Sequence, residues 1–359
     1  MAASSKLDRI RRRLIEDELD AIMVSSPENR RYMSGFTGSA GYLLISQDDA
    51  VLATDFRYVE QAGQQSPDFR VSRTAAGLGW LPEWAAEQGV KRIGFESEDL
   101  TVHTYEAFVK AVAEDEKSNK PELVGTTGIV EKLRVVKDEN EIKMLTRAVE
   151  IADQSLDSVA AAIEPGMTEE GIAWELEKAM RERGAEMISF DTIVGAGPNG
   201  ALPHHRADET VIRDGDAIVI DMGAKYQGYC SDLTRTVIVG RADDKFKEVY
   251  DIVLRAQLAA EEQVEAGMTG EQVDTIARDI ISQAGYGENF GHSLGHGVGL
   301  AVHEHPRVGP RADDVLEDGM VFTIEPGIYL SGWGGVRIED IVVLENGKAR
   351  VISKANKIG

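Results

Sequence analysis

The chain has 359 residues and a formal net charge of −23, with 62 acidic and 39 basic side chains. So large an excess of negative charge argues against nucleic acid or an anionic membrane surface as a partner. No stretch approaches the ~18 consecutive apolar residues that a membrane span requires, and residues 1–6 lead into charged sequence, so we expect neither membrane insertion nor export. The composition therefore predicts a soluble cytoplasmic protein, and the length predicts two domains.

The first third of the chain predicts alternating helices and strands. Residues 7–18 have the pattern of a basic amphipathic helix, and apolar segments with the length of strands follow at 21–24, 42–45, 50–53 and 91–95. Helices that alternate with strands are typical of an α/β layer.

A domain boundary is predicted between Gly125 and Lys137. A Gly-Thr-Thr-Gly turn there gives way to Asp138, an N-cap residue with the acid Glu141 three positions on, which marks the start of a long helix reaching to about Ile163. A second helix is expected over 168–183, ending at a glycine. We therefore assign residues 1–130 to an amino-terminal domain and residues 131–359 to a carboxy-terminal domain.

The second domain contains an internal duplication. Residues 215–221 (GDAIVID) align with residues 319–325 (GMVFTIE), so that each glycine is followed six positions later by an acid. Upstream of each segment lies the same turn and helix start, at 164–168 and 265–269. Similarity at such matched offsets indicates two copies of one structural unit.

Four acids stand at matched positions in the two copies. Asp221 is followed by a turn and Asp232, and Glu325 by a turn and Glu339. Folded as hairpins, the two segments place Asp221 roughly across from Asp232, with the same geometry for the glutamates. Opposed carboxylates about 5 Å apart repel each other and need cations when apolar strands bury them. A single such acid is more often a solvated strand or turn residue, but the repetition argues against that interpretation.

Histidines cluster near these acids, since six of the chain's seven histidines fall between residues 204 and 305. One histidine with four carboxylates makes an oxygen-rich site that suits Mn²⁺ and related ions, whereas a thiolate zinc site needs more cysteine. Four carboxylates exceed what one ion requires, so we predict two ions about 3.5–4 Å apart. Such a pair activates a shared water and polarises a carbonyl or phosphoryl oxygen, which indicates hydrolysis.

The chain resembles the family of Xaa-Pro peptidases, prolidase and aminopeptidase P, which share the pita-bread fold with methionine aminopeptidase. The matching segments occur in order along the chain, at 190–194, 202–205, 220–223, 228–236, 292–303, 325–329 and 335–340. Residues 29–39 and 54–58 are similar to the creatinase-type amino-terminal domain of these peptidases. The implied fold is α/β (α+β): a creatinase/prolidase-type domain before a pita-bread catalytic domain with pseudo-twofold duplication.

The resemblance also implies the roles of individual residues. The metal ligands are Asp221, Asp232, His296, Glu325 and Glu339, with Asp232 and Glu339 bridging two divalent ions, for which Mn²⁺ is favoured over Co²⁺ or Zn²⁺. The catalytic residues are His204 and His303, which steady the tetrahedral intermediate, and Glu325, a proton shuttle if one of its oxygens stays free. Substrate-binding residues are His204, His292, His303 and Arg337; His292 lines the proline-side pocket and Arg337 also supports the ligand shell.

The remaining histidines and the cysteine receive structural interpretations. A histidine in a loop is more often a surface or packing residue, which is our interpretation of His205, His305 and His103. Cys230, the only cysteine, cannot form an intramolecular disulfide and is compatible with a reducing compartment. We interpret it as a small packing residue, because no base motif that would activate a nucleophile accompanies it.

The activity implied by the resemblance is hydrolysis of the bond between an amino-terminal residue and proline. This bond is a tertiary amide that lacks an N–H group and is followed by a fixed ring. The run Gly35–Ser39 and the compact length favour an Xaa-Pro aminopeptidase, and an Xaa-Pro dipeptidase is the alternative. In this family the amino-terminal domain reaches the partner's active site, so a homodimer is implied.

Other functions fit less well. A metal-free pita-bread binding module is disfavoured because all five ligands are present. A methionine aminopeptidase is disfavoured by the additional amino-terminal domain. A creatinase-like amidinohydrolase is disfavoured because its reaction does not need these acids.

Overall fold

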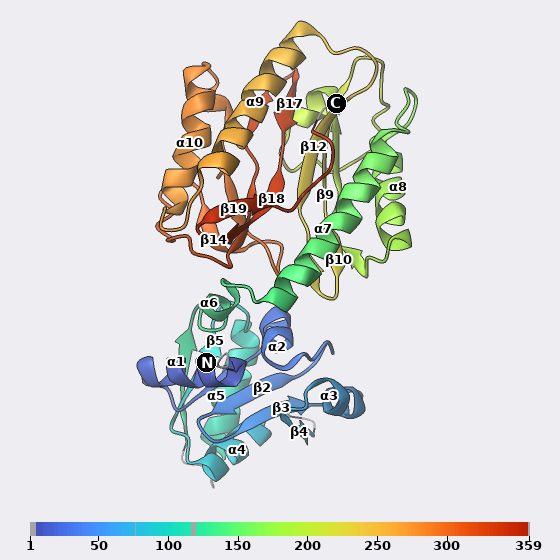
Figure 1. Cartoon of the computed structure of the whole chain (residues 1–359). Coiled ribbons are helices and arrows are strands. Elements are labelled where there is room, and N and C mark those ends of the chain that lie inside the picture. The colour runs from blue at the N-terminus through green and yellow to red at the C-terminus, as the bar shows by residue number, and fades with distance from the viewer. Residues whose placement is uncertain (1–4, 76, 116–119, 358–359) are drawn as a thin grey trace. The chain divides into compact units, whose positions relative to one another are not determined.

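The computed structural model describes residues 5–75, 77–115 and 120–357. The chain forms two compact units that divide between Arg134 and Val135. Each unit has its own core, and each is coloured in sequence order in Figure 1. Every helix in the described ranges is too short or too polar to cross a bilayer.

The first unit is built on a six-stranded mixed sheet with the order β4-β3-β2-β1-β5-β6. Strand β1 lies at its centre, antiparallel to β2 and parallel to β5. The strands are β1 (Ala21–Val24), β2 (Tyr42–Ser46), β3 (Ala50–Thr54), β4 (Arg70–Arg73), β5 (Arg92–Glu96) and β6 (Glu122–Thr126). The predicted strands at 21–24, 42–45, 50–53 and 91–95 are thus confirmed to within a residue.

Among the described residues, six helices complete this unit. They are α1 (Lys6–Glu16), α2 (Pro27–Ser34), α3 (Val59–Gln65), α4 (Trp80–Gln88), α5 (Val102–Glu114) and α6 (Glu131–Arg134). Helix α1 begins where Ser5 and Asp8 form a capping box, and its apolar face buries Ile10 and Leu14. Buried Met23, Leu44, Ile93 and Phe108 pack with α4 and α5 into one core. The sequence predicted α1 but assigned no helix to α2, α3, α4 or α5.

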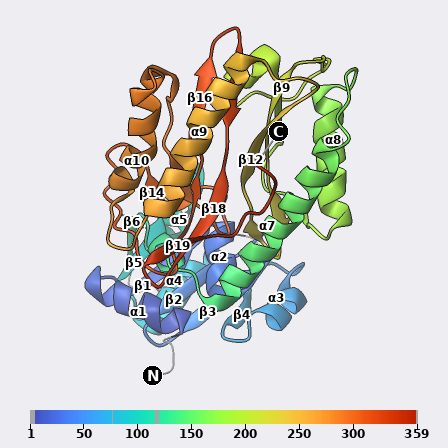
Figure 2. The ribbon, with the colours of Figure 1, turned by 45° about the horizontal axis from the view of Figure 1, so that its top comes forward.

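The second unit has four long helices around its strands. They are α7 (Glu139–Ala160), α8 (Glu169–Glu182), α9 (Asp244–Gln263) and α10 (Gly270–Gln283), with 3₁₀ turns η1 (Gly197–Ala201) and η2 (Gly287–Asn289). Figures 1 and 2 show α9 beside α10 on one side of the strands and α7 beside α8 on the other. Asp138 and Glu141 form the predicted capping box of α7, and the predicted helix over 168–183 is α8.

The strands of this unit form two larger and two smaller sheets. The larger sheets have the orders β12-β9-β8 and β14-β13-β15-β18-β19, and the smaller ones β11-β10-β7 and β16-β17. The strands are β7 (Met187–Ile188), β8 (Ile193–Ala196), β9 (Ala217–Met222), β10 (Ala224–Tyr226), β11 (Tyr229–Cys230), β12 (Leu233–Ile238), β13 (Gly295–Gly297), β14 (Glu304–Val308), β15 (Val321–Ile324), β16 (Gly327–Leu330), β17 (Gly334–Arg337), β18 (Asp340–Glu345) and β19 (Lys348–Val351).

The predicted duplication is present in the structure. Thr168 caps α8 and Thr269 caps α10 through the same side-chain hydrogen bond, to the backbone N–H three residues on. Each threonine also forms an isolated antiparallel bridge, to Val211 in one half and to Val315 in the other. Each half has its own apolar cluster, one between α7, α8 and β9 and one between α9, α10 and β15. Matched strands of the two halves therefore bring their acids to corresponding places.

Candidate metal centre

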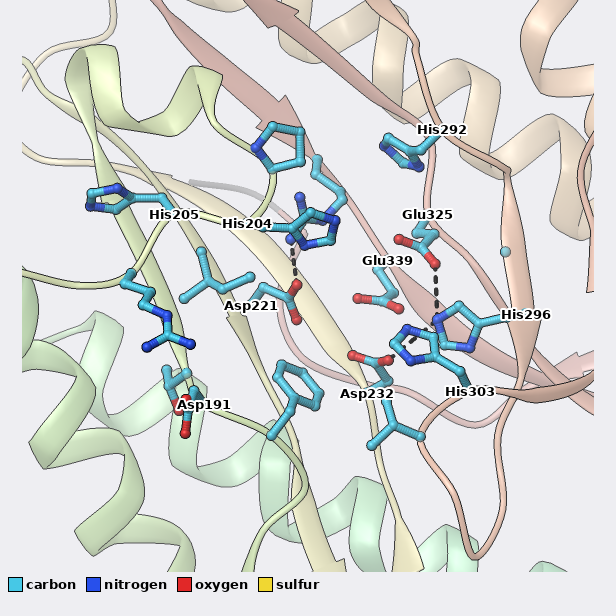
Figure 3. Close-up of a pocket in the computed structure, with 18 of the residues that line it drawn as sticks. Asp191, His204, His205, Asp221, Asp232, His292, His296, His303, Glu325 and Glu339 are labelled. Carbon is cyan, nitrogen blue, oxygen red and sulfur yellow. Dashed lines mark hydrogen bonds and ion pairs between the residues drawn. The ribbon is translucent and has the colours of Figure 1, made fainter. Parts of the chain in front are cut away.

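One cavity of about 880 Å³ lies in the second unit. Its lining includes every residue that the sequence predicted for the site: Asp221, Asp232, His296, Glu325, Glu339, His204, His292, His303 and Arg337. Figure 3 shows the carboxylates of Asp232, Glu325 and Glu339 directed toward His296 at one end of this cavity. The structure therefore brings the predicted residues together.

The two acid pairs differ in register. Glu325 and Glu339 stand at matching positions between two short ladders, because the flanking pairs Ile324↔Asp340 and Gly327↔Arg337 have the same antiparallel offset. Asp221, however, pairs with Thr234, so Asp232 lies two residues farther along the same face of its strand. The expectation that Asp221 and Asp232 lie across from each other is corrected to a diagonal placement.

The turn between β10 and β11 explains this difference. Tyr226 pairs with Tyr229, which leaves Gln227 and Gly228 as a two-residue turn with φ of 45° and 79°. Two positive φ angles are typical of a type I′ turn, which matches the twist of the strands. The turn is centred one residue later than the sequence suggested, and each residue of shift moves the pairing by two positions.

His296 presents one ring nitrogen to the carboxylates. Its Nδ1 lies 3.1 Å from the carbonyl oxygen of Gly297, an atom that can only accept, so Nδ1 carries the hydrogen in this contact. Its Nε2 faces Glu325 Oε1 at 3.3 Å and Asp232 Oδ2 at 3.6 Å. Histidines that bind metals commonly donate the other ring N–H to a carbonyl in this way. Ligand atoms of Asp232, His296 and Glu339 all lie within 4.8 Å of one another.

The buried carboxylates perturb one another. Burial raises the pKa of Asp221, and burial together with neighbouring carboxylates raises the pKa of Asp232 and of Glu339 well above the usual range. Burial acts in the same direction on Glu325, but the hydrogen bond and charge of His296 outweigh it and lower the pKa of Glu325 to about 2. Burial disfavours the charged form of His296, yet Glu325 overcomes it and raises the pKa of this imidazole.

The donor set fits divalent cations. Within the described residues, Asp221 Oδ1 and Glu339 Oε1 are buried and have no hydrogen-bond partner. A buried polar atom without a partner costs free energy, and a carboxylate in that position costs more. Carboxylate oxygens with one imidazole are the ligands that Mn²⁺ and similar ions prefer. The residues present therefore suit the metals that the sequence predicted.

Arg337 connects the ligands to two groups that the sequence analysis did not single out. Its Nη2 contacts Asp221 Oδ2, its Nε donates to Thr234 Oγ1 at 3.1 Å, and its Nη1 donates to Tyr329 OH at 2.9 Å. Thr234 in turn donates to Glu339 Oε2 at 2.7 Å. Both missed residues lie within motifs that carry the family resemblance, which is the signal that could have found them.

Two histidines near this network are held in defined orientations. The ring of His292 lies 2.8 Å from the carbonyl of Ser293 through Nδ1 and 2.9 Å from Tyr329 OH through Nε2. Burial lowers the pKa of His292, which favours the neutral ring. The ring of His303 packs edge-on against His296 with centroids 4.2 Å apart, and burial followed by the charge of His296 lowers its pKa.

The other histidines and the cysteine have the following surroundings. His305 is exposed and pairs with Asp314, and His103 is exposed on α5, which confirms both surface interpretations. Cys230 is buried within an apolar cluster, which confirms the packing interpretation. His205 differs from expectation because its side chain lines the cavity and contacts Glu169.

Comparison with known proteins identifies the family of both units. Residues 143–346 match the model of metallopeptidase family M24, and residues 6–136 match the creatinase/prolidase N-terminal domain. An Xaa-Pro dipeptidase structure from Bacillus anthracis aligns with a TM-score of 0.94 at 44% identity and covers 99% of each chain. An X-Pro aminopeptidase structure from Thermotoga maritima gives a TM-score of 0.89 at 40% identity, covering 98% of this chain and 99% of that one.

A curated relative from Pyrococcus horikoshii, named Xaa-Pro dipeptidase, is 40% identical over 351 residues and covers 97% of both chains. These matches confirm the family resemblance and the fold class, a creatinase/prolidase-type domain followed by a pita-bread domain. They also confirm that the protein is a hydrolase, since the matched family consists of metallopeptidases. The chain belongs to metallopeptidase family M24.

Proposed function

We propose that this protein hydrolyses the bond between an amino-terminal residue and proline, and that the reaction depends on two divalent metal ions. The observation that carries the proposal is the convergence of four carboxylates and His296 in one cavity. The names of its relatives support the substrate class, since proteins called Xaa-Pro dipeptidase and X-Pro aminopeptidase resemble it over nearly their whole length.

The residues that would hold the ions are those predicted from the sequence: Asp221, Asp232, His296, Glu325 and Glu339, of which the family resemblance assigns Asp232 and Glu339 to both ions. Mn²⁺ is the proposed metal, with Co²⁺ and Zn²⁺ as alternatives. When bound, such ions lower the pKa of water and polarise the scissile carbonyl. Arg337 holds Asp221 in place, because three of its nitrogens engage Asp221, Thr234 and Tyr329.

Glu325 is proposed to move the proton. Its Oε1 accepts a hydrogen bond from Thr323 at 3.0 Å and faces His296 at 3.3 Å. This leaves Oε2 as the atom that receives a proton from the attacking water and delivers it to the prolyl nitrogen. The pKa of Glu325, lowered to about 2 chiefly by His296 against the effect of burial, keeps this carboxylate unprotonated before the reaction.

The histidines are proposed to hold the peptide. His303, whose pKa is lowered by burial and by His296, offers a neutral ring that can hydrogen-bond the substrate carbonyl and the tetrahedral intermediate. His204, which also lines the cavity, is proposed to contact the same substrate groups, and His292 to face the proline ring. Phe190, Ile193 and other apolar side chains also line the cavity, and a proline ring needs shape rather than an acceptor because its nitrogen has no hydrogen.

Two activities share this chemistry. The exposed guanidinium groups of Arg206 and Arg307 line the cavity and would pair with the carboxylate that follows proline in a dipeptide, which favours the dipeptidase. The cavity volume of about 880 Å³ gives room for a longer chain, which favours the aminopeptidase. The geometry supports the dipeptidase better. Pairing with the carboxylate of a dipeptide gives the two arginines a role, whereas a longer substrate has no carboxylate directly after proline.

The test compares three substrates with added Mn²⁺ and after chelation: Ala-Pro, its carboxy-terminal amide, and Ala-Pro-Ala. A dipeptidase cleaves Ala-Pro and loses most activity on the amide, and Arg307→Met removes that preference. Release of alanine from the tripeptide at a comparable rate identifies the aminopeptidase. If none of the three substrates is cleaved in a metal-dependent reaction, the proposed function is contradicted.

We also propose that the protein is a cytoplasmic homodimer. The match of residues 6–136 to the creatinase/prolidase N-terminal domain supports the dimer that the family resemblance implies. The net charge of −23 is compatible with the cytoplasm. Light scattering at micromolar concentration should give twice the mass of 39.2 kDa, and a monomer would contradict the proposal.

A further inference from the structure

The loop that carries His204 is fastened to the start of helix α8. Backbone hydrogen bonds run from Glu169 N–H to the carbonyl of Thr210 at 3.1 Å and from Glu170 N–H to that of Asp208 at 3.1 Å. Thr168, the N-cap of α8, pairs with Val211 in an antiparallel bridge. The path of residues 197–212 therefore depends on the first turn of this helix.

The side chain of Glu169 is the centre of this attachment. It is fully buried, with an exposed fraction of 0%. Its Oε1 accepts from the Ala196 N–H at 2.7 Å and from Asn199 Nδ2 at 3.0 Å. Its Oε2 lies 2.6 Å from His205 Nε2 and accepts a longer bond from the Asp208 N–H at 3.4 Å. Four donors from the end of β8, from η1 and from the loop that follows thus converge on a single carboxylate.

His205 links this buried carboxylate to the cavity. Its side chain is 10% exposed and lines the cavity. His205 directly follows His204 in the chain, so a constraint on one acts on the position of the other. A carboxylate that accepts requires hydrogen on Nε2, so the contact with Glu169 fixes both the orientation of the ring and the nitrogen that is protonated. In Figure 3 the ring of His205 lies at the end of the cavity away from His296.

The same cluster is less suited to a metal ion. Ligand atoms of Glu169, His205 and Asp208 lie within 4.8 Å of one another. However, His205 Nε2 and Glu169 Oε2 are already bonded to each other at 2.6 Å, and Asp208 Oδ1 accepts from the Thr210 N–H at 2.7 Å. Because its atoms satisfy one another, the cluster has the character of a hydrogen-bond junction.

We propose that Glu169 is a positioning residue for peptide hydrolysis, which acts through its bond to His205 and sets the place of His204 in the cavity wall. The inference rests on the proposed function, in which His204 contacts the substrate. A displacement of about 1 Å in such a group can reduce turnover by as much as about 100-fold. Because the hydrogen bond between Glu169 and His205 is the contact that matters, a side chain that preserves it preserves activity.

The test uses four variants of the full-length, metal-loaded protein. Glu169→Leu removes the acceptor that faces His205, and His205→Leu removes the donor. His205→Gln keeps an N–H donor near the position of Nε2. Glu182→Leu is the matched control, because Glu182 is an exposed glutamate at the other end of the same helix.

We expect Glu169→Leu and His205→Leu each to lower kcat about tenfold, with KM and metal content nearly unchanged. His205→Gln and Glu182→Leu should stay within about threefold of the parent. The double variant Glu169→Leu/His205→Leu should be no worse than the poorer single variant, because each single variant already breaks the bond between Glu169 and His205. Hydrogen exchange of residues 197–210 should accelerate in Glu169→Leu and His205→Leu only.

Several results would overturn this proposal. Full kcat in Glu169→Leu, additive losses in the double variant, or damage in His205→Gln equal to that in His205→Leu would each do so. A third bound metal ion that is lost in His205→Leu would make the cluster a metal site instead. If the parent protein cleaves no Xaa-Pro peptide, the proposed function fails, and the exchange rates alone decide whether Glu169 orders the loop.

Discussion

Replacement of Asp232 by asparagine should stabilise the metal-free protein while weakening metal binding. Asp232 and Glu339 are almost fully buried, and the ligand atoms they offer lie within 4.8 Å of each other. Two unit charges at that distance repel by about 3 kcal/mol at an effective dielectric constant near 20. Asp232→Asn removes this repulsion, or the equivalent cost of protonating a carboxyl group whose pKa burial has raised. We therefore expect the free energy of unfolding of the metal-free protein to rise by about 3 kcal/mol.

The same substitution should have the opposite effect when metal is present. A ligand at 100 times its dissociation constant stabilises a folded protein by about 2.7 kcal/mol, and this term should nearly vanish when a bridging carboxylate is lost. The assay is urea unfolding in chelator and in excess Mn²⁺, with Asp279→Asn as an exposed control that should change neither curve. An Asp232→Asn protein that is less stable than the parent in chelator, or equally stabilised by Mn²⁺, would refute the reasoning.

Three further predictions concern other parts of the second unit. His204→Ala and His303→Ala should lower kcat while leaving metal content intact, and loss of metal in either would show that a ligand had been taken for a substrate contact. Glu304→Gln should destabilise the protein by about 3 kcal/mol in urea, since it leaves the Lys137 ammonium buried without the carboxylate 2.7 Å away, whereas an unchanged midpoint would contradict this. Burial raises the pKa of Asp153 from 3.8 to about 6, so its contribution to stability is complete below pH 3.8 and lost as pH rises through 6. The free energy of unfolding of Asp153→Asn, measured in urea, should therefore match that of the parent at pH 3.5 and exceed it by about 3 kcal/mol at pH 7. An equal difference at both pH values would contradict the assignment.

Local sequence signals predicted the elements that position the ligands. The capping box of Asp138 and Glu141 fixed the start of α7, and the matched glycine-to-acid spacing identified β9 and β15 as copies. These features depend on residues close together in the chain, where capping and apolar patterning act directly. The proposal of a shared site then followed from the duplication, because equivalent strands place their ends in equivalent positions.

Features that depend on tertiary contacts were not predictable in this way. The diagonal placement of Asp221 and Asp232 depends on a turn at Gln227 whose positive φ angle is unusual for a residue with a side chain. The role of His205 depends on Glu169, which lies 36 residues earlier in the chain and comes near only when α8 packs. In both cases the decisive interaction joins residues whose proximity the local sequence does not encode.

The measurement that tests the central claim most directly is a titration of the chelator-treated protein with Mn²⁺, in which bound metal and hydrolysis of Ala-Pro are followed in the same samples. The account predicts negligible cleavage without metal and a rate that rises to a plateau as bound metal reaches two ions per chain. Full cleavage without metal, or a protein that holds two ions and leaves every Xaa-Pro peptide intact, would contradict it.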